Sequence, residues 1–437
     1  MTTRHPLVAL DRRHVWHPFT QERTASDPIP ISHARGTVLH TTDGREYLDL
    51  ISSWWVITHG HGHPAIAQAI GEQAKRLEQV IFAGFTHEPA VRLAEGLIAR
   101  LPEGLNRVFY SDNGSTSVEV ALKMSCQYWQ NRGEARKRFL AFEGGYHGDT
   151  VGAMSMGQTS GFFDAFRNML FPVDTLPYPT TWEGDERIEQ KEKASLAAVA
   201  EYLSRHGSAC AAVLLEPLIQ GAGGMRMCRP GYLAKLAALV KEAGVLLIFD
   251  EVMTGFGRTG ALFACEKAGV IPDIICLSKG LTAGFMPLSA TVCQERIYEA
   301  FLGEGFDRAF THGHSFTANP LGCAAAVASL ALFETEKTLQ RVARIEEIHR
   351  QRLAALSRFP KARQRRVTGV VAALDVAAGD PGYQSKVGPW LKHFFLEQGL
   401  LLRPLGNVVY LLPPYCITEA ELHRAWDGVE AALKQVA

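Results

Sequence analysis

Six short apolar runs between residues 105 and 294 most strongly constrain the fold of this 437-residue chain. The runs are RVFYS, RFLAFEG, AAVLLEP, VLLIFDE, DIICLSK and LSATVC, and longer segments with helical periodicity separate them. Strands that alternate with helices in this way indicate an α/β layer built on a mostly parallel sheet. We therefore predict a large α/β domain over residues 60–325.

The two ends of the chain have a different pattern. Residues 36–50 alternate apolar and polar side chains around Asp43 and Gly44, which is a strong signal for a β-hairpin. After about residue 325 come helical segments, then the strand-like runs RVTGVVAALDV and VVYLLPPY, then a terminal helix. We expect residues 1–59 to join residues 326–437 in a smaller α+β domain.

Composition argues against several classes of function. The 45 basic and 45 acidic residues balance, so no overall field would attract nucleic acid or an anionic membrane. No apolar run approaches the roughly 20 residues of a membrane span, and the N-terminal segment lacks the apolar stretch of a signal peptide. The eight cysteines form no CxxC pair. These features predict a cytoplasmic protein with reduced thiols that binds neither nucleic acid nor membrane.

Lys279 raises the first chemical question, because it follows the apolar run Ile274–Leu277 and precedes a loop that contains glycine. One interpretation is a solvated lysine at the end of a strand. The other is a partly desolvated lysine on a rigid strand end, which loses its proton more easily and can form a Schiff base with a carbonyl. This segment alone does not decide between them.

The segment YSDNGSTSVEVALK predicts that a helix starts directly after a strand. Thr116 and Glu119 have the spacing of a capping box, and an apolar-periodic helix follows. Free N–H groups at such a helix start can bind an anion, and Gly114 lets a phosphate come close to the backbone. The alternative is an ordinary helix cap after a turn.

The run VLLIFDE ends in Asp250 and Glu251 and is followed by Gly255, Gly257 and Gly260, which form a literal GxGxxG. A nicotinamide-binding fingerprint is disfavoured, because other residues separate these glycines from the strand and the next strand leads to a lysine instead of an acid. Asp250 and Lys279 are 29 residues apart, about one strand-helix-strand unit, so we expect them to end neighbouring strands. Pyridoxal phosphate needs a lysine, a carboxylate for its pyridine nitrogen and a phosphate cradle. Three weak signals therefore support one cofactor.

Histidines cluster in THGHGHP, with His59, His61 and His63, and in THGHSF, with His312 and His314. Neither cluster has a cysteine or carboxylate ligand set nearby. We interpret both as turn loops and predict no metal site.

Three tryptophans and one arginine leave two interpretations open. Trp16, Trp54 and Trp55 are either core aromatics or, beside the glycine-histidine loop, walls of a substrate pocket. Arg403 lies between apolar runs and needs a carboxylate partner, which is either a structural ion pair or a ligand.

Longer segments resemble one family over nearly the whole chain. They are RRHVWHPFTQ, SSWWVITHGHGHP, DNGSTSVEVALKMSCQYW, GYHGDTVGAMS, EPLIQGAGGMRM, DEVMTGFGRTG, LSKG, THGHSFTANPLGCAAA and RPLGNVVYLLPPY. Together they are similar to the class III aminotransferases of fold type I, whereas DEVMTGFGRTG alone would mark only the broader class. The resemblance implies an α/β, PLP-dependent transferase with a large, mostly parallel sheet flanked by helices and a smaller α+β domain from both termini.

The resemblance implies a role for each residue around the cofactor ring. Lys279 would carry pyridoxal 5'-phosphate as a Schiff base and then shuttle a proton between Cα of the donor and C4′ of the cofactor. Asp250 would pair with the pyridine nitrogen. Val252 and Tyr146 would pack on the two faces of the ring.

The phosphate site implied by the family is shared between subunits. Gly114 and Ser115 would hold the phosphate, and His314 and Ser315 of the neighbouring subunit would complete its site in a homodimer. Where this chain has His314 and Ser315, the family pattern leads us to expect proline and threonine. A hydroxyl and an N–H remain for the phosphate.

The segments SSWW and RPLGNVVYLLPPY are most similar to the members that convert 8-amino-7-oxononanoate to 7,8-diaminononanoate in biotin synthesis. Arg403 would bind the carboxylate of the oxononanoate. The substrate-binding residues that the resemblance implies are Phe19, Trp54, Tyr146, Asp149, Lys279, Gly313 and Arg403.

The amino donor implied by these members is S-adenosylmethionine. Phe19 stands where a tyrosine is expected, and some relatives with phenylalanine there use lysine, so a lysine donor is the alternative. Two other hypotheses about the function are a class III aminotransferase that acts on ω-amino acids or diamines, and a pyridoxal-binding regulator. The regulator would need a basic helix-turn-helix domain, for which this chain has no spare length.

Overall fold

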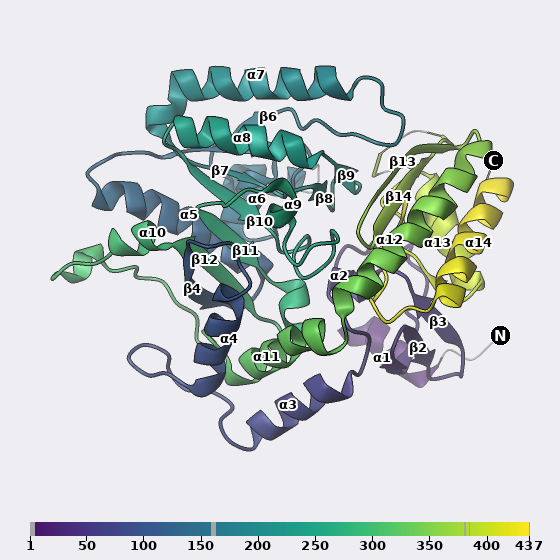
Figure 1. Cartoon of the computed structure of the whole chain (residues 1–437). Coiled ribbons are helices and arrows are strands. Elements are labelled where there is room, and N and C mark those ends of the chain that lie inside the picture. Colours follow the sequence, from purple (N-terminus) through teal and green to yellow (C-terminus); the bar gives the residue numbers. More distant parts are fainter. Residues whose placement is uncertain (1–4, 159–162, 380–381, 384, 437) are drawn as a thin grey trace.

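A seven-stranded sheet forms the centre of the computed structural model, which describes residues 5–158, 163–379, 382–383 and 385–436 (Figure 1). All six apolar runs form strands of this sheet, as predicted. In sheet order the strands are β4 (Leu105–Ser111), β12 (Ser289–Gln294), β11 (Ile274–Leu277), β10 (Leu246–Asp250), β7 (Cys210–Leu215), β5 (Arg138–Phe142) and β6 (Asp174–Leu176). Of these seven strands, β12 runs opposite to the other six, which are parallel to one another, so the predicted α/β fold with a mostly parallel sheet is confirmed.

Both faces of the sheet are covered by helices. In β10, Leu247 and Phe249 belong to one apolar cluster while Leu246 and Ile248 belong to another, as the two-residue period of a strand requires. The first cluster includes residues of α4 (Glu88–Ile98), α7 (Ile188–His206) and α8 (Pro230–Glu242). The second includes residues of α5 (Gly114–Asn131), α6 (Val151–Met156) and α10 (Glu295–Glu299). A strand that is buried on both faces has a continuous run of apolar residues in the sequence.

Three smaller sheets accompany the central one. They contain β1 (Ile31–Arg35), β2 (Val38–Thr41), β3 (Glu46–Asp49) and β15 (Leu400–Leu401); β13 (Ala362–Thr368), β14 (Val371–Val376) and β16 (Val408–Leu411); and β8 (Ile219–Gln220) with β9 (Arg226–Met227). β2 and β3 form the predicted hairpin. The run RVTGVVAALDV contains the end of β13 and all of β14, with a turn at Gly369, where φ is +56°.

Both ends of the chain meet in one region, because β15 pairs in parallel with β3 (Figure 1). The remaining helices are α1 (Pro6–His14), α2 (Ser52–Trp55), α3 (Pro64–Ala74), α9 (Ala264–Ala268), α11 (Pro320–Thr335), α12 (Thr338–Ala355), α13 (Val387–Glu397) and α14 (Glu419–Gln435). The division at 59/60 and 325/326 stays a prediction, and the second boundary falls inside α11.

One local prediction about α5 was wrong. The helix is capped by Asn113, whose side chain accepts the N–H of Thr116 at 3.0 Å while the Thr116 hydroxyl accepts the N–H of Asn113 at 3.1 Å. Glu119 instead accepts the N–H of Gly152 at 2.6 Å, which ties α5 to α6. Asparagine is a better cap than threonine in this position, so the helix starts earlier than the proposed Thr116–Glu119 box.

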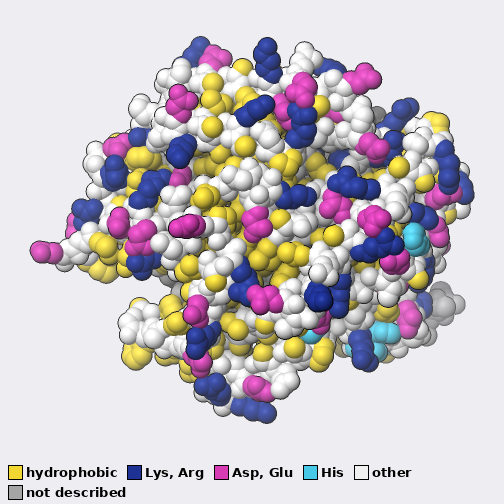
Figure 2. Space-filling view, viewed as in Figure 1, with side chains coloured by type: hydrophobic (Ala, Val, Ile, Leu, Met, Phe, Trp, Pro, Cys, Tyr) yellow, Lys and Arg dark blue, Asp and Glu magenta, His cyan; other side chains and the backbone are white. Residues whose placement is uncertain are grey.

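Basic and acidic side chains are interspersed over the face in Figure 2, in keeping with equal numbers of each sign. Among the described helices, none is both long and apolar enough to cross a membrane.

Candidate active site

Asp250 and Lys279 lie at the same edge of the central sheet. Asp250 ends β10, and Lys279 follows β11 by two residues, with Asp250 opposite Cys276 in parallel register. The prediction that the two residues end neighbouring strands is confirmed. Lys279 has a φ of +45°, a left-handed conformation that non-glycine residues rarely adopt. Such strain is commonly found at functional sites, where the surrounding structure holds it.

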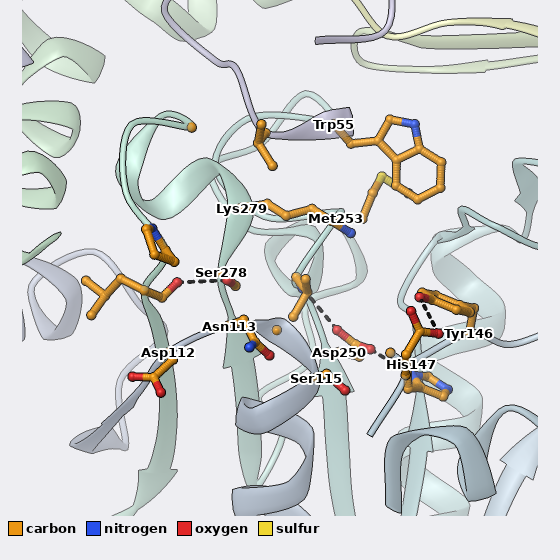
Figure 3. Close-up of a pocket in the computed structure, with 18 of the residues that line it drawn as sticks. Trp55, Asp112, Asn113, Ser115, Tyr146, His147, Asp250, Met253, Ser278 and Lys279 are labelled. Carbon is orange, nitrogen blue, oxygen red and sulfur yellow. Dashed lines mark hydrogen bonds and ion pairs between the residues drawn. The ribbon is translucent and has the colours of Figure 1, made fainter. Parts of the chain in front are cut away.

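A cavity of about 630 Å³ surrounds the side chain of Lys279. In Figure 3 Lys279 extends into it between Trp55 and Asp250, and Nζ lies 4.9 Å from the centre of a Trp55 ring. Burial lowers the pKa of Lys279, against the opposing effect of Asp250 and Glu216. Lys279 therefore gives up its proton more readily than a solvated lysine. This favours the interpretation of Lys279 as a reactive amine over a solvated lysine at a strand end.

Asp250 is held by two hydrogen bonds. Its Oδ2 lies 2.7 Å from Nδ1 of His147, and its Oδ1 accepts the N–H of Val252 at 3.1 Å. Both Asp250 and His147 are only 4% exposed, so the pair is shielded from water. His147 was not singled out in the sequence, although it lies beside Tyr146 in the GYHGD segment. A carboxylate fixed in this way can accept a hydrogen bond from a protonated ring nitrogen of a ligand.

The start of α5 opens into the same cavity. Thr116 uses its N–H for the Asn113 cap, while the N–H groups of Gly114 and Ser115 have no acceptor within the described ranges. A Cβ at position 114 would lie 2.5 Å from Cγ1 of Val252. Only glycine fits there, and it leaves the two N–H groups open to an anion at the positive end of the helix.

A second cavity of about 350 Å³ adjoins the first. The two share Trp55, Tyr146, Asp149 and Lys279. The second cavity is also lined by Pro18, Phe19, Trp54, Ala222, Tyr383, Arg403, Leu405 and Tyr410. A ligand beside Lys279 can therefore extend from one cavity into the other.

Arg403 lines the second cavity and has no carboxylate partner in the described part of the chain. Its guanidinium lies 4.4 Å from the centre of a Trp54 ring, and Phe19 packs edge-on against Trp54 with 5.7 Å between ring centres. The structural ion pair that was one of two interpretations of Arg403 is not formed here. Arginine stacked on an aromatic ring keeps its donors free for a carboxylate.

The backbone that carries the two tryptophans is strained. Ser52, Ser53 and Trp55 have φ values of 51°, 58° and 66°. Arg258, which is only 1% exposed, donates to the carbonyls of Trp55 and Ile57 at 3.1 and 2.8 Å. These hydrogen bonds hold the segment in a conformation that it would not adopt alone.

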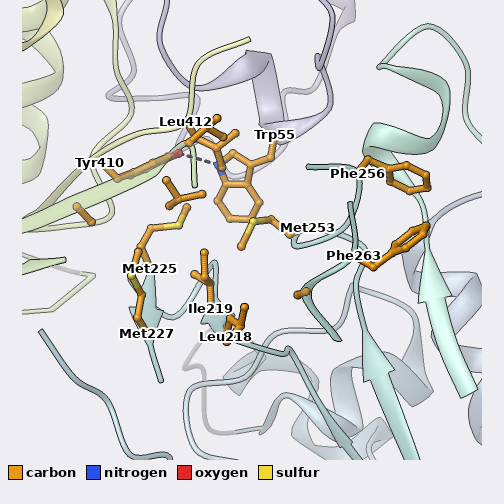
Figure 4. Close-up of a cluster of buried hydrophobic side chains, with 14 of the residues drawn as sticks. Trp55, Leu218, Ile219, Met225, Met227, Met253, Phe256, Phe263, Tyr410 and Leu412 are labelled. Carbon is orange, nitrogen blue, oxygen red and sulfur yellow. Dashed lines mark hydrogen bonds between the residues drawn. The ribbon is translucent and has the colours of Figure 1, made fainter. Parts of the chain in front are cut away.

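The indole of Trp55 is fixed from its far side as well. Nε1 donates to the hydroxyl of Tyr410 at 2.9 Å, and Figure 4 shows the ring among Met253, Met225 and Tyr410. Trp55 is therefore both a core residue and a wall of the two cavities, so the two interpretations of this residue do not exclude each other. Trp16 is 88% exposed and lines neither cavity.

The residues of the THGHSF loop lie outside both cavities of this single chain. His314 is 2.7 Å from Asp112, which lines the first cavity, and Gly313 and Ser315 are exposed. The other histidine loop makes pairs of its own, His61 with Asp49 and His63 with Glu336. Among the residues that the structure describes, no three histidine, cysteine, aspartate or glutamate side chains are grouped as metal ligands.

Known proteins resemble the chain over almost its full length. The sequence model of the family described as aminotransferase class-III matches residues 20–433. A protein of Synechococcus elongatus named adenosylmethionine-8-amino-7-oxononanoate aminotransferase is 54% identical over 97% of this chain and 99% of its own. A protein of the same name from Geobacter sulfurreducens is 40% identical over 98% of this chain and 97% of its own.

Solved structures of aminotransferases are also similar to this chain over almost its full length. The crystal structure of the enzyme of that name from Methanocaldococcus jannaschii has a TM-score of 0.92 at 35% identity and covers 98% of this chain and 99% of that one. An amine transaminase from an uncultivated Pseudomonas species, in its PLP-bound form, has a TM-score of 0.90 at 31% identity. The match covers 97% of this chain and 99% of that one.

Proposed function

The chain belongs to the class III aminotransferases, and on that premise we propose that it converts 8-amino-7-oxononanoate to 7,8-diaminononanoate in biotin synthesis. The observation that carries this proposal is the 54% identity to the Synechococcus elongatus protein of that name over nearly both chains. The site supports it, because Arg403 offers a carboxylate site in a cavity that Lys279 also lines. The free thiols of all eight cysteines suit the cytoplasm, where we place the enzyme.

The residues of the first cavity fit pyridoxal phosphate, the cofactor of this family. The N–H groups of Gly114 and Ser115 would hold its phosphate, and Asp250 would accept a hydrogen bond from its protonated pyridine nitrogen. Val252 and Tyr146 would cover the two faces of its ring. When bound, the cofactor supplies an electron sink for the carbon that bears the amino group.

Lys279 performs the proton chemistry in this proposal. Its amine would hold the cofactor, and in its neutral form it would take a proton from Cα of the donor and deliver it to C4′ of the cofactor. The lowered pKa of Lys279 favours the neutral form that this step needs. The hydrogen bond between Asp250 and His147 keeps this part of the cavity wall polar and ordered.

The second cavity would bind both substrates in turn. Arg403 would bind the carboxylate of the oxononanoate, and its chain would pack along Trp54. Phe19 and Asp149 would contact the donor, Asp149 through the donor's amino group. Gly313 would approach this site from the partner subunit.

We expect S-adenosylmethionine to be the amino donor. A half-reaction with each compound alone, followed by the cofactor's absorbance, should show conversion by S-adenosylmethionine. Phe19 lacks the hydroxyl of a tyrosine, and one hydrogen bond is worth roughly 0.5 to 1.5 kcal/mol, so binding weakens by up to about tenfold without being abolished. Conversion by lysine but not by saturating S-adenosylmethionine would contradict the donor assignment.

The same assay tests the acceptor. 7,8-Diaminononanoate added alone should convert the cofactor in the reverse direction, whichever donor is natural. Conversion by β-alanine or putrescine together with no response to 7,8-diaminononanoate would favour an aminotransferase of ω-amino acids or diamines instead.

We further propose a homodimer in which His314 and Ser315 complete the phosphate site of the other subunit. Mixing two inactive variants tests this: Lys279→Ala, which lacks the amine, and Ser315→Phe, which would block the partner's phosphate site. After joint refolding, half of the dimers are mixed and each has one intact site, so roughly a quarter of the native activity should return. A fully active monomer in sedimentation, or no recovery on mixing, would contradict the shared site.

A further inference from the structure

Glu216 is a buried carboxylate in the wall of the first cavity that the proposed function does not use. It directly follows β7, in which Leu215 pairs with Phe249 of β10, so it lies beside Asp250 at the same sheet edge. Glu216 is 5% exposed and lines the first cavity. Burying a carboxylate is costly unless hydrogen bonds replace its water.

Two backbone N–H groups replace that water. Oε1 accepts the N–H of Tyr146 at 3.1 Å, and Oε2 accepts the N–H of Gly221 at 2.9 Å. No lysine or arginine pairs with Glu216 among the described residues. Tyr146 belongs to the turn after β5, and Gly221 belongs to the turn between β8 and β9. One carboxylate therefore joins two turns that are 75 residues apart in the chain.

The two turns also pack directly on each other. A Cβ at Gly223 would lie 2.4 Å from the carbonyl oxygen of Gly144, so the backbones are in close contact with no room for a side chain between them. The carboxylate of Glu216 fastens the two turns to the sheet edge from which it projects. A shift of either turn would therefore disturb the other.

Each turn sets an aromatic wall of the site. Tyr146 lines both cavities, and Ala222, beside Gly221, lines the second. A Cβ at Gly221 would lie 3.1 Å from Cζ3 of Trp55 and 3.0 Å from Cε of Met253, so this turn abuts the indole. The turn and the indole lie in one cluster in Figure 4, where Met225 and Met253 pack against Trp55.

We propose that Glu216 is a positioning residue of the transamination: by holding both turns, its carboxylate fixes Tyr146 and Trp55 at the separation that the cofactor ring and the substrate between them require. This inference rests on the proposed function, which assigns Tyr146 to the face of the ring. Glu216 acts through these two residues, since both of its oxygens are engaged by the backbone.

The charge of Glu216 makes the positioning depend on pH. Burial raises the pKa of Glu216 to about 7, while His147 opposes the rise and Asp250 adds to it. Among the described residues, six titratable or charged groups interact electrostatically with Glu216. They are Tyr146, His147, Tyr178, Arg226, Asp250 and Lys279. The protonated carboxyl accepts two N–H groups less well, because one oxygen then carries hydrogen. The two turns should be held firmly above about pH 7 and more loosely below it.

Glu216→Gln tests the inference, with Glu251→Gln as a matched control. Glu251 is also fully buried, accepts the N–H groups of Ala264 and Cys265 at 2.6 and 2.8 Å, and has its pKa raised to about 7 by burial. It lines neither cavity. The two variants remove the same group from the same kind of environment, so their losses of thermal stability should be similar.

Only the first variant should affect the site. Apo Glu216→Gln should bind pyridoxal phosphate about tenfold more weakly in a titration of tryptophan fluorescence, since one buried N–H loses its acceptor. Its affinity should also lack the decline below about pH 7 that we expect of the native protein, and KM for the oxo acid should rise more than kcat falls. Glu251→Gln should keep both the affinity, within about twofold, and the pH dependence.

Equal affinities in the two variants, or an unchanged pH dependence in Glu216→Gln, would overturn the inference. If Glu216→Gln does not fold, Glu216→Asp replaces it, because the shorter carboxylate keeps its charge but reaches only one N–H; the same loss of cofactor affinity is expected, and none would overturn the inference. The titration needs no substrate, so failure with 8-amino-7-oxononanoate would count against the proposed function alone.

Discussion

Turnover of Lys279→Ala is expected to fall by about four orders of magnitude, because proton transfer by a positioned side chain contributes up to about 10⁴-fold. The variant also lacks the amine that would hold the cofactor covalently. It should bind pyridoxal phosphate reversibly, lose it on dialysis and show the absorbance of the free aldehyde. Thermal unfolding should show a folded protein, because Lys279 forms no ion pair within the part of the chain that is described.

A second lysine provides the control. Lys267 donates to the carbonyl of Thr259 at 2.7 Å and lines neither cavity, so Lys267→Ala should keep turnover near the native level. Borohydride reduction of the native enzyme should place the cofactor on the peptide that contains Lys279. Label on any other lysine would refute the assignment.

Arg403→Met is expected to lower kcat/KM for the oxononanoate by about 10 to 150-fold. Hydrogen bonds to charged groups contribute about 1.5 to 3 kcal/mol, which corresponds to that range. Methionine keeps most of the length and the packing against Trp54 but removes the charge. The loss should be mainly in KM, because the carboxylate of the substrate is remote from the reacting carbon.

Two comparisons separate recognition from folding. Arg403→Lys keeps the positive charge but not the planar fork, so it should recover only part of the loss. Cofactor affinity of the apo protein should stay native in both variants, because Arg403 lines only the second cavity. An unchanged KM in Arg403→Met would mean that the carboxylate is bound elsewhere.

The sequence predicted the sheet and its reactive edge because both depend on local patterns. Strands buried on two faces are continuous apolar runs, and the carboxyl ends of parallel strands meet at one edge. Asp250 and Lys279 could therefore be placed together from their spacing alone. β6, which has only three residues, gave no apolar run long enough to predict.

Contacts between distant segments could not be predicted in the same way. The partner of Asp250 is His147, 103 residues away, and the acceptor for the N–H of Tyr146 is Glu216, 70 residues away. A single carboxylate after a strand gives no signal of the turns that it will hold. The prediction of the α5 cap was wrong for a local reason. Asn113 and Thr116 are both candidate caps for the same helix start, and Asn113, the stronger cap, is the one that caps the helix.

The contacts that the C-terminal part of the chain makes with the strained tryptophan segment also order events during biosynthesis. Ser52 donates its hydroxyl to the carbonyl of Leu412, 360 residues later, at 2.7 Å. A ribosome adds about 5 to 20 residues per second, so β4 to β12 emerge well before Tyr410 and Leu412, which bind the Trp55 indole and the Ser52 hydroxyl. A nascent chain can thus form the sheet edge with Asp250 and Lys279 while the second cavity still lacks its wall. The second cavity is completed only after Tyr410 has been added to the chain.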